Sequence, residues 1–129
     1  MTPSTSRKAA RRQALYLLYQ WDLTGQELAS LYEGEPDAFA RSLAEAVAAR
    51  AEALDLRISA ASSDWPADRL GTLERNILRI GVYELEEETV PREVAINEAV
   101  VLAKRYATEE AARLVNGILA RVAREEEAA

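Results

Sequence analysis

The sequence predicts an all-α protein folded as a compact helical bundle. No segment alternates apolar and polar residues with the period of two that a half-buried strand requires. Along most of the chain, apolar residues instead recur three and four positions apart, as in helices that bury one face. The 129 residues include only 5 Gly and 4 Pro, so we expect short loops between antiparallel helices rather than hairpins.

The first expected helix runs from Ser4 or Thr5 to about Asp22. Any of Ser4, Thr5 or Ser6 can supply the N-cap oxygen, and Gly25 can end the helix. This is the only strongly basic segment of an otherwise acidic chain, whose net charge is −6. Two interpretations stay open from this segment alone, an ordinary solvated helix face and a nucleic-acid contact.

The basic helix carries cations and aromatic rings on a shared face. Lys8, Arg12, Tyr16 and Tyr19 lie at helical spacing, and Ala and Leu residues with Trp21 form a core-facing stripe elsewhere. Cations neutralise phosphates and rings stack on unpaired bases. The pattern therefore indicates a helix that buries one face and shows a face of cations and rings, which suits an RNA contact and an ordinary solvated face equally well.

The remaining elements follow from apolar spacing and from turn residues. Segment 26–32 is expected to be a short helix, and 36–59 one long helix with an interrupted apolar stripe. Segment 73–87 is apolar over a wide arc, which predicts a central helix packed on two sides. Gly81 inside it is tolerable where another helix approaches closely, and close packing is also the simplest role for Gly117.

Two more helices are expected, at 92–106 and 108–124. Thr108 fits an N-cap followed by acids in the first turn, where the helix dipole favours them. Residues 125–129 are expected to form a frayed tail and residues 1–6 a flexible arm. The whole chain, 1–129, is expected to be a single domain.

Composition excludes several classes of function. The chain contains no His and no Cys, which removes catalytic triads and zinc sites built from those residues. It carries no glycine-rich phosphate loop, EF-hand loop or dinucleotide fingerprint, so we expect no cofactor, no metal and no catalysis. With no long apolar run and no signal-peptide pattern, a cytoplasmic protein is expected.

Polar residues elsewhere have simple structural interpretations. The acidic cluster of Glu84, Glu87 and Glu88 is expected on solvated helix faces. Asn97 and Asn116, beside apolar stripes, are expected to form hydrogen bonds between helices.

Several segments in a fixed order resemble the NusB family of bacterial transcription antitermination factors. They are RRQA at 11–14 with LYQWD at 18–22, ERNILRIGVYEL at 74–85, VPREVAINEAV at 90–100, AKRY at 103–106 and VNGIL at 115–119. The similarity covers about positions 7–122 and is weakest over 25–63. Each motif alone is weakly specific, but together, at this spacing, they are specific to the family.

The resemblance implies a fold and a role. Members of this family are all-α, with two three-helix bundles and a short N-terminal arm, and they are not enzymes. They pair with a small-subunit ribosomal protein, NusE, and the pair binds the boxA element of nascent RNA, notably in ribosomal RNA operons. Some members form homodimers that cover the RNA face.

The resemblance also assigns residues. Positions matching the family's RNA contacts are Arg7, Lys8, Arg11, Arg12, Tyr19, Arg79, Tyr106 and Arg113. Glu74 and Asp68 match positions that face the ribosomal partner. Leu114 stands where a Phe is frequent, which removes a ring for base stacking, and Ala107 stands where Gly is common, which predicts a differently built turn.

Two other interpretations remain at this stage. One is a helical protein–protein interaction module whose basic arm meets an acidic partner without any RNA preference. The other is an NusB-like domain of the kind found at the N-terminus of RNA cytosine methyltransferases. The chain reaches Ala129 without a cofactor motif, which makes the second the less favoured.

Overall fold

The predicted all-α class is confirmed. The computed structural model describes residues 6–62 and 70–128, which form six α-helices and one short 3-10 helix and include no strand. The elements are α1 (Arg7–Thr24), η1 (Leu28–Leu31), α2 (Ala38–Ala49), α3 (Ala51–Ala61), α4 (Thr72–Glu87), α5 (Arg92–Tyr106) and α6 (Glu109–Ala128). None of the helices in these residues combines the length and apolar character needed to cross a membrane.

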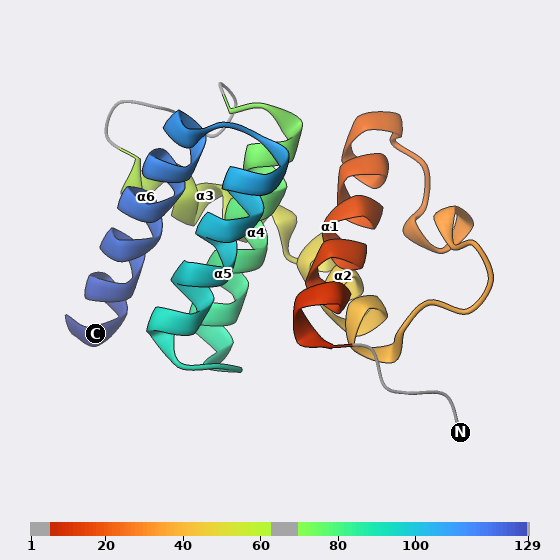
Figure 1. Ribbon diagram of the computed structural model, residues 1–129, viewed down its shortest axis with the longest axis horizontal. Helices are drawn as coiled ribbons and strands as arrows, with labels where there is room; N and C mark the ends of the chain where they lie inside the picture. Colours follow the sequence, from red (N-terminus) through yellow and green to blue (C-terminus); the bar gives the residue numbers. More distant parts are fainter. Residues whose placement is uncertain (1–5, 63–69, 129) are drawn as a thin grey trace.

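Helix α4 is the centre of the fold, as its wide apolar arc predicts. It contacts α1, α2, α3, α5 and α6, and most of its residues are buried. Helices α4, α5 and α6 pack together on one side, while α1 and α2 lie beside them and η1 lies at the outer edge (Figure 1). The core is continuous through both groups, so α1 is held against α4 by burial of its Ala and Leu stripe.

Helix α1 is capped at both ends by residues that the sequence offers. The Ser6 hydroxyl accepts a hydrogen bond from the amide of Ala9 at 3.1 Å, which satisfies one of the free donors of the first turn. Gly25 ends the helix with φ of +73°, a left-handed conformation that glycine adopts without strain. The helix therefore begins slightly later than expected and continues through Thr24.

The expectation of one long helix over 36–59 is wrong, because the structure divides this segment into α2 and α3. The break lies at Arg50, whose backbone leaves helical geometry at φ −112° and ψ 14°. The Arg50 guanidinium reaches α4 and pairs with Glu86 and Glu87. Neither Gly nor Pro marks this break, so the sequence signals it only as the polar residue that interrupts an apolar stripe.

Helix α6 continues to Ala128, so the frayed tail expected from residue 125 is wrong for residues 125–128. Ion pairs hold this end to the rest of the fold. Arg57 of α3 pairs with Glu126 at 2.9 Å and with Glu125 at 3.7 Å, and Arg92 of α5 pairs with Glu127 at 2.8 Å. The acidic run is therefore part of the packed helix.

Two glycines inside helices differ in their surroundings. A side chain at Gly81 would bring its Cβ to 2.6 Å from Cδ1 of Leu119 on α6, so the close neighbour is a side chain and not the helix backbone expected there. Gly117 is exposed, and a Cβ there would meet nothing within 4 Å. Its expected role in close packing is therefore wrong.

Candidate functional site

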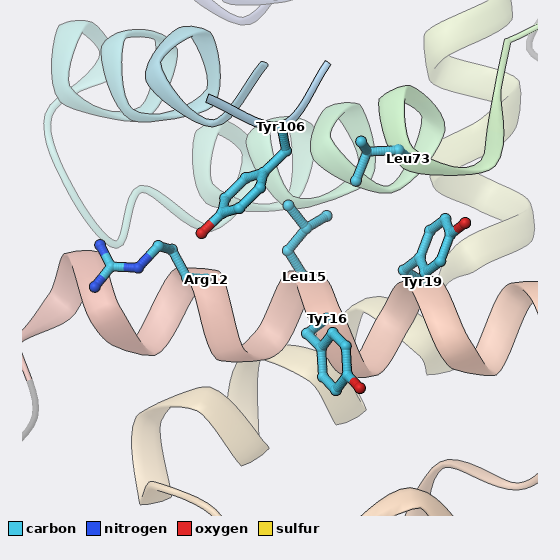
Figure 2. Close-up of a pocket in the computed structure, with 6 residues that line it drawn as sticks. All are labelled: Arg12, Leu15, Tyr16, Tyr19, Leu73 and Tyr106. Atoms are coloured by element: carbon cyan, nitrogen blue, oxygen red, sulfur yellow. The ribbon is translucent and has the colours of Figure 1, made fainter. Parts of the chain in front are cut away.

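A pocket of about 310 Å³ opens between α1 and the facing ends of α4 and α5. Its lining comes from Arg12, Leu15, Tyr16, Tyr19, Leu73 and Tyr106. Tyr106 points from the end of α5 toward α1, and Leu73 and Tyr19 lie on the other side of Leu15 (Figure 2). Tyr16 is 58% exposed and Tyr106 is 44% exposed, so aromatic rings are open to solvent around a largely apolar cavity.

Arg12 is the one cation in the lining of this pocket. It is half-buried, and within residues 6–62 and 70–128 it forms no ion pair with an acid. A second cation lies nearby, because the Arg105 guanidinium is 5.5 Å from the centre of the Tyr106 ring. The pocket therefore combines exposed rings with positive charge and has no acidic residue in its lining.

The two cations at the start of α1 already have internal contacts. The Arg7 guanidinium stacks 3.9 Å from the centre of the Phe39 ring on α2. Lys8 pairs with Glu98 of α5 at 3.0 Å, and its side chain remains 64% exposed. Both residues stay on the surface on which the sequence places them, and a phosphate could reach Lys8 without disturbing the core.

Arg11 does not lie on this surface, which corrects the expectation that it is exposed to RNA. It is 3% exposed and donates to the Glu84 carboxylate, which is also buried. Hydrogen bonding to Glu84 raises the pKa of Arg11 and outweighs the lowering caused by burial. Glu84 is thus a buried counter-charge, and its expected place on a solvated face is wrong.

Arg79 is likewise buried, at 5% exposed. It donates to Asp55 of α3 at 2.6 and 2.7 Å and to Asp22 of α1 at 3.0 Å. Asp22 also accepts from Arg75 and Asn76. This network ties α1 and α3 to α4 and keeps Arg79 buried, so the expectation of an accessible RNA contact there is corrected.

The side-chain amide of Asn76 belongs to this network: it is fully buried, donates to Asp22 and to the Thr72 carbonyl, and accepts from Arg79. Asn97 and Asn116 are both exposed. The expectation that those two join helices through buried hydrogen bonds is therefore wrong, and the sequence pattern does not distinguish them from Asn76.

A second pocket, of about 370 Å³, lies between the starts of α4 and α6. Its lining comes from Leu70, Gly71, Glu74, Thr108, Glu110, Ala111, Arg113 and Leu114. Glu74 lies in the first turn of α4, where the helix dipole favours an acid. The structure thus brings three residues singled out from the sequence, Glu74, Arg113 and Leu114, to one place. Asp68 lies outside the described residues.

The turn before α6 is built without a left-handed residue. Ala107 has φ −121° and ψ −115°, so it avoids the positive φ that would strain an alanine. The strain that an alanine would suffer at positive φ therefore does not arise at this position. The turn separates Tyr106 in the first pocket from Thr108 in the second, so the two pockets are neighbours.

Sequence reasoning missed several residues of the two pockets. Leu15 and Leu73 form apolar lining of the first pocket, and Glu110 supplies a second acid to the other. Helical spacing places Tyr16 and Arg12 on one face of α1, but only the fold brings Leu73 of α4 and Tyr106 of α5 to the same pocket. Arg105 is in the AKRY motif, yet its contact with Tyr106 has no signal in the spacing.

Known proteins resemble this chain over nearly its whole length. A model of the NusB family matches residues 8–124. The transcription antitermination protein NusB of Rubrobacter xylanophilus is 41% identical over 121 residues, which cover 88% of this chain and 87% of that protein. The protein of the same name from Myxococcus xanthus is 39% identical over 132 residues, covering 92% and 94%.

Solved structures agree in fold. NusB of T. maritima superposes with a TM-score of 0.84 at 32% identity, covering 95% of this chain and 94% of that one. A chain from the crystal structure of the antitermination factors NusB and NusE in complex with dsRNA gives a TM-score of 0.81 at 33% identity, covering 92% and 96%. Sequence and structure lead to the same assignment: this chain belongs to the NusB family.

Proposed function

We propose that this chain is a transcription antitermination factor, a non-catalytic adaptor that binds boxA-type RNA together with the ribosomal protein NusE. Family membership supports the role, because relatives carry the name transcription antitermination protein. A related chain was crystallised with NusE and RNA. Such an adaptor would act in the cytoplasm, where RNA is transcribed in bacteria.

The observation that carries the proposal is the cationic, aromatic pocket between α1 and α5. Arg12 has no acidic partner among the described residues, and the pocket's rings are open to solvent. Phosphate contacts by Arg12 and Lys8 would position the strand, since charge neutralisation supplies most of the sequence-independent affinity. Base recognition would fall to the tyrosines.

The RNA site proposed from the structure is smaller than the set that the resemblance implies. It keeps Arg7, Lys8, Arg12, Tyr19, Tyr106 and Arg113, all of which are exposed or half-buried. Arg11 and Arg79 become positioning residues, because their buried ion pairs hold α1 against α4. Their loss would disturb the surface without removing a phosphate contact.

The second pocket is the proposed contact for NusE. It presents the carboxylates of Glu74 and Glu110 beside the apolar side chains of Leu70 and Leu114, and it is also lined by Arg113, the cation that the proposed RNA site keeps. That combination suits a basic side chain flanked by apolar residues on the partner. This pocket adjoins the first pocket, which we call the tyrosine pocket because Tyr16, Tyr19 and Tyr106 line it. A partner bound here would therefore lie next to the RNA.

The test is an anisotropy titration of a labelled boxA RNA with this chain and NusE. We expect the boxA strand to bind more tightly than a scrambled strand of equal length and charge. Equal affinity for both strands would contradict sequence-selective binding. It would favour the alternative function, a helical protein–protein interaction module with no RNA preference. A duplex of the same sequence belongs in the series, because the related complex contains double-stranded RNA.

Self-association is a separate question that the same samples answer. Homodimers that cover the RNA face would compete with RNA, so dimers should dissociate when RNA and NusE are added. Sedimentation velocity of the free chain and of the complex measures this directly.

A further inference from the structure

Resting on the proposed RNA-binding function, we infer that Glu98 of α5 is a built-in counter-charge to Lys8 that limits the affinity of this surface for RNA of any sequence. A phosphate can still contact Lys8 and help to position the strand. The ion pair as a whole is neutral, however, so it adds little electrostatic attraction. Glu98 is thus a positioning residue that acts through Lys8.

The two side chains of the pair differ in how far they reach into solvent. Lys8 Nζ lies 3.0 Å from Oε1 of Glu98, and the Lys8 side chain is 64% exposed whereas that of Glu98 is 12% exposed. An ammonium group has three donors, so it can hold the carboxylate with one and keep others toward solvent. The acid lies beneath the cation, where it lowers the positive potential that an approaching phosphate meets.

The influence of Glu98 extends to a second cation of α1. The hydrogen bond to Glu84 is the main cause of the raised pKa of Arg11, and the charge of Glu98 adds to it. Glu98 therefore faces the basic side of α1 and is not one more acid on a solvated surface.

The helical spacing places this acid within a row of cations. Lys8 and Arg12 are four residues apart and share a face of α1, while Glu98 and Arg105 are seven apart and share a face of α5. Arg12 lines the tyrosine pocket, and Arg105 lies 5.5 Å from the Tyr106 ring at its edge. A strand that follows these cations toward the pocket passes Glu98.

The contrast between Lys8 and Arg12 shows what the acid changes. Arg12 has no acidic partner in the described part of the chain, so a phosphate there displaces a counterion of the solution, and the release of that ion favours binding. At Lys8 the counter-charge is Glu98, which is fixed to the protein and is not released. Lys8 should therefore add little to the affinity and to its salt dependence.

The test is a double-mutant cycle of Lys8→Gln and Glu98→Gln, carried out with the full chain and NusE. Dissociation constants of a labelled boxA strand and of a scrambled strand are measured by anisotropy over a range of salt concentrations. Glu93→Gln is the matched control, because it removes the same charge from an exposed position on another face of α5. Glu98→Asp is the conservative variant, which keeps the charge.

We expect Glu98→Gln to bind both strands roughly 2- to 5-fold more tightly than wild type at low salt, the effect of one exposed charge. The gain should be equal for the two strands, because phosphate contacts carry no sequence information. The slope of log K against log salt should become steeper by about 0.7. Glu98→Asp and Glu93→Gln should show neither change.

The other two corners of the cycle follow from the charge of the pair. Lys8→Gln should weaken binding, because it leaves the acid of Glu98 without its cation. The double variant, in which the pair is again neutral, should return to the affinity and the slope of wild type. Thermal melting checks that each variant is folded, and Glu98→Ala, which also removes the acid, takes the place of Glu98→Gln if that variant is not.

Four results would overturn the inference. Wild-type affinity and slope in Glu98→Gln would mean that the acid does not oppose RNA, while a boxA preference of wild type would leave the proposed function intact. An equal gain in Glu93→Gln would make the effect one of net charge. Tighter binding of NusE to Glu98→Gln without RNA would place the acid at the protein partner. Absence of RNA binding by wild type would remove the proposed function and this inference together.

Discussion

Arg11 and Glu84 form a two-point ion pair in the core: Arg11 Nε lies 2.9 Å from Oε1 and Nη2 lies 2.8 Å from Oε2. The two residues are 73 positions apart in the sequence and join α1 to α4. Arg12, the next residue, points to the tyrosine pocket instead. Adjacent arginines therefore have different tasks, one holding α1 in place and the other facing the proposed ligand.

The first prediction concerns this buried pair. Arg11→Met leaves the Glu84 carboxylate buried without its partner, which should cost roughly 3–5 kcal/mol of unfolding free energy. Replacing both residues, as Arg11→Met with Glu84→Leu, should recover most of that loss, because apolar groups of similar size can fill the same space. Urea denaturation of the three proteins measures both effects. A double variant no more stable than Arg11→Met would contradict the account.

The second prediction concerns acid stability. Burial raises the pKa of Asp22, but hydrogen bonds from Arg75 and Asn76 and the charges of Arg79 and Arg75 outweigh it, so the pKa falls below its ordinary value of 3.8. The stability that Asp22 contributes is present above that value and is lost as the pH falls through the lower folded-state pKa. Wild type should therefore lose stability below about pH 4.

The matched variant is Asp22→Asn, which keeps the shape but not the charge. It should be less stable than wild type at pH 7, and the difference should shrink as the pH is lowered. Thermal unfolding at several pH values follows both proteins. A constant difference from pH 7 to pH 2 would show that the charge of Asp22 is not the source of its contribution.

The third prediction concerns the end of α6. Changing Glu125, Glu126 and Glu127 together to Gln removes the ion pairs with Arg57 and Arg92 and should cost about 1 kcal/mol at low salt, since partly exposed pairs contribute little each. The cost should nearly vanish in 1 M salt, which screens such pairs. Chemical denaturation at both salt concentrations tests this, with Glu33→Gln in an exposed loop as the control. A loss that persists at high salt would point to packing instead.

The fourth prediction compares two glycines. Gly117→Ala should stabilise the protein by roughly 0.5–1 kcal/mol, because it adds helix propensity where a Cβ meets nothing. Gly81→Ala gains the same propensity but pushes into Leu119, which is fully buried, and overpacking costs roughly 1–3 kcal/mol. Gly117→Ala should thus be the more stable variant by thermal melting. The reverse order would refute this packing argument.

Much of the fold could be read from local sequence signals. Ser6 and Gly25 mark the ends of α1, and the apolar arc of α4 identifies the central helix, because capping and periodicity act within a few residues. The break at Arg50 and the ordered end of α6 depend on ion pairs with distant helices. Such contacts leave no local pattern, so the sequence alone indicated one long helix and a frayed tail.

The candidate site shows the same division. Helical spacing places Arg12, Tyr16 and Tyr19 on one face, and the fold adds Tyr106 from α5. Spacing does not separate Arg11 from Arg12, since whether a cation is buried depends on an acid elsewhere, here Glu84. A charged residue looks the same in the sequence whether it meets water or a buried counter-charge.

The position of the RNA along α1 at the tyrosine pocket can be tested by the salt dependence of boxA binding in Arg12→Gln. Loss of one phosphate contact on a single strand should reduce the slope of log K against log salt by about 0.7. Arg124→Gln, an exposed arginine on α6, should leave the slope unchanged. If Arg12→Gln binds with the wild-type affinity and slope, the RNA does not lie on this surface.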